Sequence, residues 1–191
     1  DGWTTEDPTV EESLGVMVKW PLIHPVSSRF SRRSGSDQSS RARERLQKID
    51  TYFEDAEAWL EARETDPTIP FNARFAALSS VISGEAPLFI DASRASQIES
   101  AVAWSKRRGY EIVIVGGTAS AECAPLLAQH GVPVMIKGMH RLPITRHADH
   151  DAIYRTPERL RKAGVLFSIG NGSGEPQHER NLAHQAGKLV P

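Results

Sequence analysis

Two spacings of apolar residues divide the chain. Between residues 37 and 64, apolar positions recur every three or four residues, which is the spacing of one face of an α-helix. From residue 87 onward the pattern changes to short apolar runs, each followed by a helix-like segment or a polar loop. The four runs cover residues 88–91, 112–117, 132–138 and 165–170. The first part is therefore predicted to be helical, and the second to alternate strands with helices.

Residues 1–86 are predicted to form an N-terminal loop and a helical insert. The first 36 residues mix apolar fragments with prolines and the start of a Ser/Arg-rich stretch. That stretch, around residues 29–40, is typical of an exposed loop. The helix over 37–64 should lie outside the sheet, and a second, shorter helix is predicted over 72–83. The side chains expected to be buried on the long helix are Leu46, Ile49, Phe53 and Leu60.

Residues 87–191 are predicted to form four β/α units. Runs that are apolar almost throughout are typical of strands buried on both faces of a parallel sheet. The intervening segments supply crossover helices, the last of which is predicted to begin with Thr156 as its N-cap and Pro157 at its first position. This order indicates the α/β class, with the four strands parallel and neighbouring in chain order.

Function in such a sheet is expected at the C-terminal ends of the strands, because parallel strands present these ends together. The four predicted ends contain Asp91, Gly116 and Gly117, His140 and Arg141, and Asn171. We expect Asp91, Gly117, His140 and Asn171 to converge. Arg141 could hold a carboxylate with two hydrogen bonds and His140 could donate one, or both could anchor the backbone of their own loop.

Composition removes several classes of function. The chain has 23 Lys and Arg against 24 Asp and Glu, so its net charge of -1 gives no case for nucleic acid or anionic lipid as a partner. No apolar run is long enough to span a bilayer, and the chain is expected to be soluble, either cytoplasmic or periplasmic.

The single cysteine, Cys123, excludes an intrachain disulfide and a CxxC zinc site. Because the chain lacks an initiator Met, we expect it to be a fragment of a longer protein.

The runs LFIDAS, VIVGGT, VPVMIKGMHRLP and AGVLFSIG resemble the second half of a metal-dependent amidohydrolase of the imidazolonepropionase-like kind. The likeness covers about residues 87 to 191. It implies a (β/α)8 barrel of the TIM type, of which this chain supplies about half, with the active site on loops at the C-terminal ends of the strands. It also implies hydrolysis of a C–N bond in a small or cyclic amide, with zinc or another divalent metal in the full-length fold.

The positions that bind the metal in active members hold other residues here. In such members a His ends the fifth strand and another ends the sixth, and an Asp after the eighth strand serves as base and ligand. This chain has Asp91 at the first position, Gly116 or Gly117 at the second, and Asn171 or Ser173 at the third. Glycine donates nothing, and the amide of Asn171 cannot act as a general base. Asp91 alone would make a weak metal site, so no metal is expected to bind this chain by itself. The resemblance places Asp91 and Asn171 at catalytic positions and Gly117, His140 and Arg141 at substrate-binding positions.

A second metal site is conceivable in the loop before the last helix. His140, His147 and His150 are separated by seven and three residues, and Asp149 and Asp151 flank the last of them. Imidazole and carboxylate groups are zinc ligands, but histidines in a polar loop are more often solvated. The cluster is therefore a minor hypothesis.

Three functions follow as alternatives. The first is an amidohydrolase-like enzyme whose metal is held mainly by residues outside this chain. The second is a non-catalytic small-molecule-binding or partner subunit derived from that family. The third is a doubly wound nucleotide-binding domain that uses Gly116-Gly117-Thr118 as a phosphate loop, although the usual glycine fingerprints are missing.

A half barrel leaves two open strand edges and an uncovered inner face, which template aggregation when they stay exposed. The predicted edge strands, 88–90 and 165–169, carry bulky apolar side chains and no charge. We therefore expect these edges to be covered by missing barrel strands of the same parent protein or by another copy of the chain.

Overall fold

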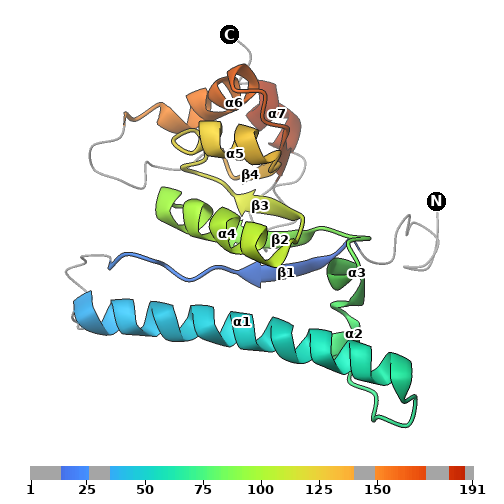
Figure 1. Cartoon of the computed structure of the whole chain (residues 1–191). Coiled ribbons are helices and arrows are strands. Elements are labelled where there is room, and N and C mark those ends of the chain that lie inside the picture. Colours follow the sequence, from blue (N-terminus) through green and yellow to red (C-terminus); the bar gives the residue numbers. More distant parts are fainter. Residues whose placement is uncertain (1–13, 26–34, 140–148, 171–180, 188–191) are drawn as a thin grey trace, which may run out of the picture.

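Five parallel strands in chain order form the single sheet of the described chain (Figure 1). The structure is a computed structural model and describes residues 14–25, 35–139, 149–170 and 181–187. The strands are β1 Val16–Lys19, β2 Leu88–Ala92, β3 Ile112–Gly116, β4 Val134–Lys137 and β5 Phe167–Gly170. The α/β class and the parallel order of the four predicted strands are confirmed.

Helices connect each pair of strands. They are α1 Gly35–Thr65, α2 Ala73–Ala76, α3 Ser79–Ile82, α4 Ala95–Arg108, α5 Ala124–His130, α6 Ala152–Lys162 and α7 Leu182–Gly187. Right-handed crossovers between neighbouring parallel strands place their helices on one face of a sheet. In this chain each strand from β1 to β4 is followed by one or more helices before the next strand begins (Figure 1). No described helix is long and apolar enough to cross a membrane.

The first strand, β1, lies in a part of the chain for which the sequence predicted no strand. Val16 to Lys19 pair in parallel with Leu88 to Asp91, and the Trp20 amide extends the ladder by donating to the Asp91 carbonyl at 3.1 Å. The sheet therefore extends into the first 86 residues. The edge of β2 that was expected to need an outside partner is covered by this chain's own β1, so β1 and β5 are the edges of the described sheet.

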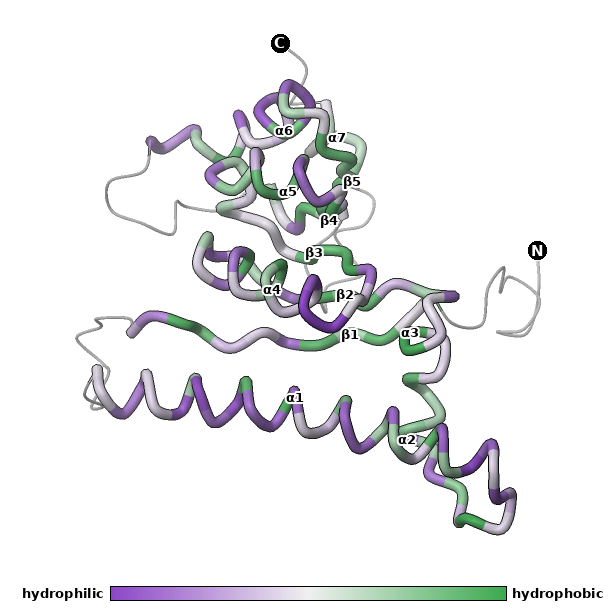
Figure 2. Tube along the Cα trace, viewed as in Figure 1, coloured by the Kyte–Doolittle hydropathy of each residue, from purple (hydrophilic) through white to green (hydrophobic). Residues whose placement is uncertain are grey.

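The long helix α1 packs against α4 and the residue Tyr110 that follows it through an aromatic contact. Phe53 is 2% exposed, and its ring centroid lies 5.2 Å from that of Trp104 and 5.3 Å from that of Tyr110. Leu46, Ile49 and Leu60 are only partly buried. Burial was thus predicted correctly for Phe53 and too strongly for the other three. Most residues of α1 are hydrophilic (Figure 2), so only a narrow strip of the helix is fully buried.

A group of polar contacts fixes how α1 faces α4. The Arg108 guanidinium lies 3.6 Å from the Asp50 carboxylate, 3.5 Å from Glu54 and 3.6 Å from Glu57. The indole Nε1 of Trp104 donates to Asp50 Oδ1 at 2.5 Å. Three acids one helical turn apart therefore converge on the C-terminal end of α4, where a basic group also suits the helix dipole.

Two helix boundaries differ from the prediction. The segment 72–83 forms two single turns, α2 and α3, and Asn72 caps the first by accepting from the Arg74 amide at 3.1 Å. Helix α6 begins at Ala152, so Pro157 lies inside it and Thr156 is not its N-cap. The helix begins before the proline because its buried positions already begin at Ile153. The buried face of α6 consists of Ile153, Thr156, Pro157 and Leu160.

The two faces of the sheet differ in burial. Alternate strand residues such as Leu88, Ile90, Ile114 and Ile136 are fully buried. Several residues between them, which point to the opposite face, are less buried, although Val115 is fully buried. Phe89, Val113 and Met135 are partly exposed, and Met17 is 57% exposed. The second face is thus apolar and only partly covered within the described chain, as expected of an incomplete barrel.

Candidate functional site

The C-terminal ends of all five strands lie along one edge of the sheet, because every pair is parallel. Asp91 and Gly117 lie there, as predicted. Lys19 ends β1 in register with Asp91, and Lys137 ends β4. Three predicted site residues, His140, Arg141 and Asn171, fall outside the described residues, as does Ser173.

The end of β3 is a tight glycine turn. Gly116 has φ of +100° and Gly117 has φ of +53°, a region that other residues rarely adopt. A Cβ added at Gly116 would lie 2.7 Å from Ser93 Oγ, and one added at Gly117 would lie 2.6 Å from Val134 Cγ1. A histidine cannot stand at either position unless its neighbours move.

The backbone amides of this turn are already engaged inside the protein. Gly117 N donates to the Ala92 carbonyl at 3.0 Å and Ala119 N donates to the Ser93 carbonyl at 2.9 Å. Ser120 N closes the turn on the Gly117 carbonyl at 3.0 Å. A phosphate loop needs several free amides that point at the anion. This turn instead uses these amides to tie β3 to the end of β2.

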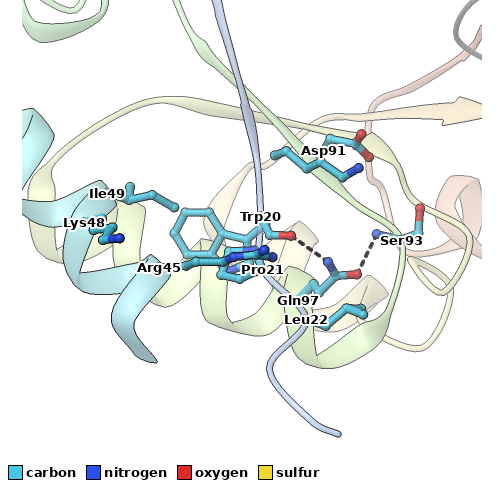
Figure 3. A pocket seen from close by; sticks show the side chains of 10 residues that line it. Trp20, Pro21, Leu22, Arg45, Lys48, Ile49, Asp91, Ser93 and Gln97 are labelled. Atoms are coloured by element: carbon cyan, nitrogen blue, oxygen red, sulfur yellow. Dashed lines mark hydrogen bonds between the residues drawn. The ribbon is translucent and has the colours of Figure 1, made fainter. Parts of the chain in front are cut away.

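A cavity of about 840 Å³ opens beside Asp91 (Figure 3). Three parts of the fold enclose it: the segment after β1, the first half of α1, and the turn from β2 into α4. Its lining side chains include Lys19, Trp20, Arg45, Lys48, Asp91 and Ser93. The cavity is thus continuous with the strand ends and combines an apolar wall with charged groups.

Gln97 holds the wall of this cavity together. Its side chain is nearly buried, and its Nε2 donates to the Trp20 carbonyl at 2.9 Å (Figure 3). Its Oε1 accepts from the backbone amides of Ser93 at 3.3 Å and Arg94 at 3.2 Å. One amide side chain therefore joins the segment after β1 to the turn that begins α4.

The sequence analysis missed Lys19, Trp20 and the side chains of α1 as site residues. For Lys19, the sequence contained one signal of a strand end. The sequence VMVK at 16–19 is almost the same as VMIK at 134–137, which was identified as part of a strand. The contribution of Arg45 and Lys48 had no such signal, because only the packing of α1 brings them to the strand ends.

The described residues offer few side chains that could bind a metal ion together. This described part of the chain contains no group of three or more His, Cys, Asp or Glu that could hold a metal ion. The carboxylates of Asp149 and Asp151 lie 3.9 Å and 2.7 Å from Arg155, so the acids beside His150 are paired with a cation. His140 and His147 are outside the described residues. The metal that the family resemblance implies therefore does not fit the residues that the structure describes.

Cys123 does not supply a nucleophile. Its side chain is 3% exposed, and its Sγ donates to the Ala95 carbonyl at 3.7 Å. Burial, with Glu99 and Glu122 nearby, raises the pKa of the thiol to about 11. Because the thiolate is the reactive form, this side chain is inert at neutral pH.

Comparison with known proteins supports the fold. No protein-family model matches the chain, and no curated protein matches it in sequence. The structure is similar to that of an amidohydrolase from Thermotoga maritima MSB8, with a TM-score of 0.73 and 17% sequence identity. The match covers 99% of this chain and 49% of the Thermotoga chain, so this chain spans about half the length of that protein. The fold is therefore an α/β parallel-strand fold of the amidohydrolase barrel type, of which the chain supplies about half.

Proposed function

We propose that this chain is the ligand-binding half of an amidohydrolase-type barrel and that it holds a small molecule at its strand ends without hydrolysing it. The observation that carries the proposal is the glycine turn at the end of β3. A side chain added at Gly116 or Gly117 would collide with Ser93 or Val134, so neither position can present a metal-binding or proton-transferring group unless its neighbours move.

The charges at the other described strand ends support the same conclusion. A hydrolytic metal requires about three donors and an open position for water. Asp91 offers one carboxylate, while Lys19 stands in register beside it and Lys137 ends β4. Two ammonium groups along this edge disfavour a divalent cation and favour an anion.

Hydrolysis of a C–N bond in a small or cyclic amide is the second candidate. One observation favours it: the fold likeness to the Thermotoga amidohydrolase covers nearly the whole chain. In that case the rest of the barrel would supply most of the ligands of a zinc or other divalent ion, and Asp91 would add at most one oxygen ligand.

The sheet is proposed to be completed by further barrel strands, either of the same parent protein or of another copy of the chain. Met17 and Phe89 are exposed or partly exposed on the sheet face opposite the buried one. An apolar face and two free edges favour such neighbours. The 49% coverage of the Thermotoga chain supports the same proposal.

Metal content tests the proposed function. The full-length protein is incubated with excess zinc, freed of unbound metal by gel filtration, and analysed by mass spectrometry for its elements. The proposal predicts far less than one zinc per barrel. About one zinc per barrel would refute the proposal, and loss of that zinc in an Asp91→Asn variant would show that Asp91 is one of its ligands.

A further inference from the structure

The cavity beside Asp91 continues along the face of α1. A smaller hollow of about 150 Å³ shares Pro21, Leu22 and Arg45 with it and adds Arg41 and His24 to the lining. Arg41, Arg45 and Lys48 are spaced by four and three residues, so they lie on one side of the helix. The two hollows therefore form one groove between α1 and the segment after β1, which we name the α1 groove.

Positive charge dominates the α1 groove. Its lining includes four fixed cations, Lys19, Arg41, Arg45 and Lys48, against the single carboxylate of Asp91. The whole chain carries a net charge of -1, so this excess is local. Lys48 also lines a separate hollow on α1 together with two acids, Glu44 and Asp55.

These cations have no partners within the described part of the chain. None of the four forms an ion pair or a side-chain hydrogen bond there, whereas Arg108, Arg155 and Lys162 are each paired with acids. Four cations clustered with one carboxylate repel one another, which lowers the stability of the folded state. A bound anion removes that repulsion, and guanidinium groups bind carboxylates and phosphates with two hydrogen bonds each.

Apolar side chains lie between the charged groups. Trp20, Pro21 and Leu22 form one wall of the cavity, and Ile49 of α1 adds to its lining (Figure 3). An inorganic ion would leave this surface unused, whereas an organic body would cover it. The cavity is also large enough for a molecule of metabolite size.

We propose that the α1 groove binds a small organic anion with at least two acid groups, which are held by Arg45, Lys48 and Arg41. This inference rests on the proposed ligand-binding function and names the chemical class of its ligand. The acid groups are carboxylates or phosphates. The apolar wall contacts the organic body.

Calorimetric titration of the full-length protein at low ionic strength tests the inference. The probes are citrate, which carries carboxylates, fructose 1,6-bisphosphate, which carries phosphates, and neutral glucose. At least one of the two anions should bind, glucose should not, and affinity should fall as salt is added. Binding of neither anion would overturn the inference.

Two matched variants locate the site. Arg45→Gln should weaken binding of the anion at least about tenfold, whereas Arg107→Gln should change it less than about twofold. Arg107 is an exposed residue at the end of α4, outside the groove, and its substitution removes the same charge. Asp91→Asn should strengthen binding, because it removes the carboxylate from the groove. Equal weakening by both arginine variants would contradict the location in the groove.

Failure of this inference is distinguishable from failure of the proposed function. A metal-free protein that binds neither anion would retain the proposed function but refute the anionic ligand. A zinc-containing protein whose binding of citrate is lost in Arg45→Gln would refute the non-hydrolytic function and leave the anion site in place.

Discussion

The packing of Phe53 decides whether α1 stays against the sheet and holds the α1 groove in shape. Its ring is 2% exposed and contacts the rings of Trp104 and Tyr110 at 5.2 and 5.3 Å between centroids. Arg45 and Lys48 lie on the same helix, about two turns and one and a half turns before Phe53. Replacing Phe53 with alanine removes the main apolar anchor of the helix.

The magnitude follows from burial. Truncation of a buried Phe to Ala costs about 3–5 kcal/mol, including the cavity left behind and the lost ring contacts. The free energy of unfolding of a domain is about 5–15 kcal/mol, so Phe53→Ala removes a large share of it. The same variant should also weaken binding of an anion in the groove, because the cationic side chains lose their fixed position.

Urea unfolding followed by tryptophan fluorescence measures this loss in the full-length protein. Phe71→Ala is the matched control, because the same atoms are removed from a side chain that is 67% exposed. Phe71 has ring contacts with Trp59 and Arg63, so its removal should cost no more than about 1 kcal/mol. A loss below about 1 kcal/mol for Phe53→Ala, or equal losses for the two variants, would refute the packing that we describe.

Two further predictions concern the strand ends and their neighbours. Gly117→Ala should lower the free energy of unfolding by about 2–4 kcal/mol, because the added Cβ is strained at a positive φ and overlaps Val134. The control is Gly109→Ala, at a residue with φ of +78° and nothing within 4 Å of an added Cβ, which should cost only about 1–2 kcal/mol. Equal losses in urea unfolding would show that the side chain of Val134 moves aside freely. The thiol of Cys123, with its pKa raised to about 11, should react slowly with Ellman's reagent at pH 8 in the native protein and rapidly in urea. A rapid reaction of the native thiol at pH 8 would contradict its burial.

The local pattern of apolar and polar residues was sufficient to predict most of the strands and helices. Continuous apolar runs predicted β2 to β5, and the three- and four-residue spacing predicted α1 to within two residues at its N-terminal end and one at its C-terminal end. The strand β1 was missed although VMVK at 16–19 is almost the same as VMIK at 134–137, because four residues are too short a pattern to distinguish a strand from an apolar fragment of a loop. What makes them a strand is pairing with residues 72 positions later in the chain, as between Val16 and Leu88.

The candidate site was predictable only where it depends on strand ends. The rule that parallel strands present their C-terminal ends together placed Asp91 and Gly117 correctly on one edge. The α1 groove depends on how α1 lies beside the segment after β1, and these two parts were interpreted separately as insert and loop. No local spacing indicates that Arg45 and Trp20 would line the same cavity.

Sedimentation of the isolated 191-residue chain at micromolar concentration tests the central claim, that its five-stranded sheet is an open half of a barrel. An apolar sheet face and two free edges, at β1 and β5, should lead the chain to associate with itself or to unfold without cooperativity. The account predicts species larger than 21.1 kDa or a broad unfolding transition. A monomer with a single cooperative transition would show that the sheet is complete by itself and would contradict the half-barrel account.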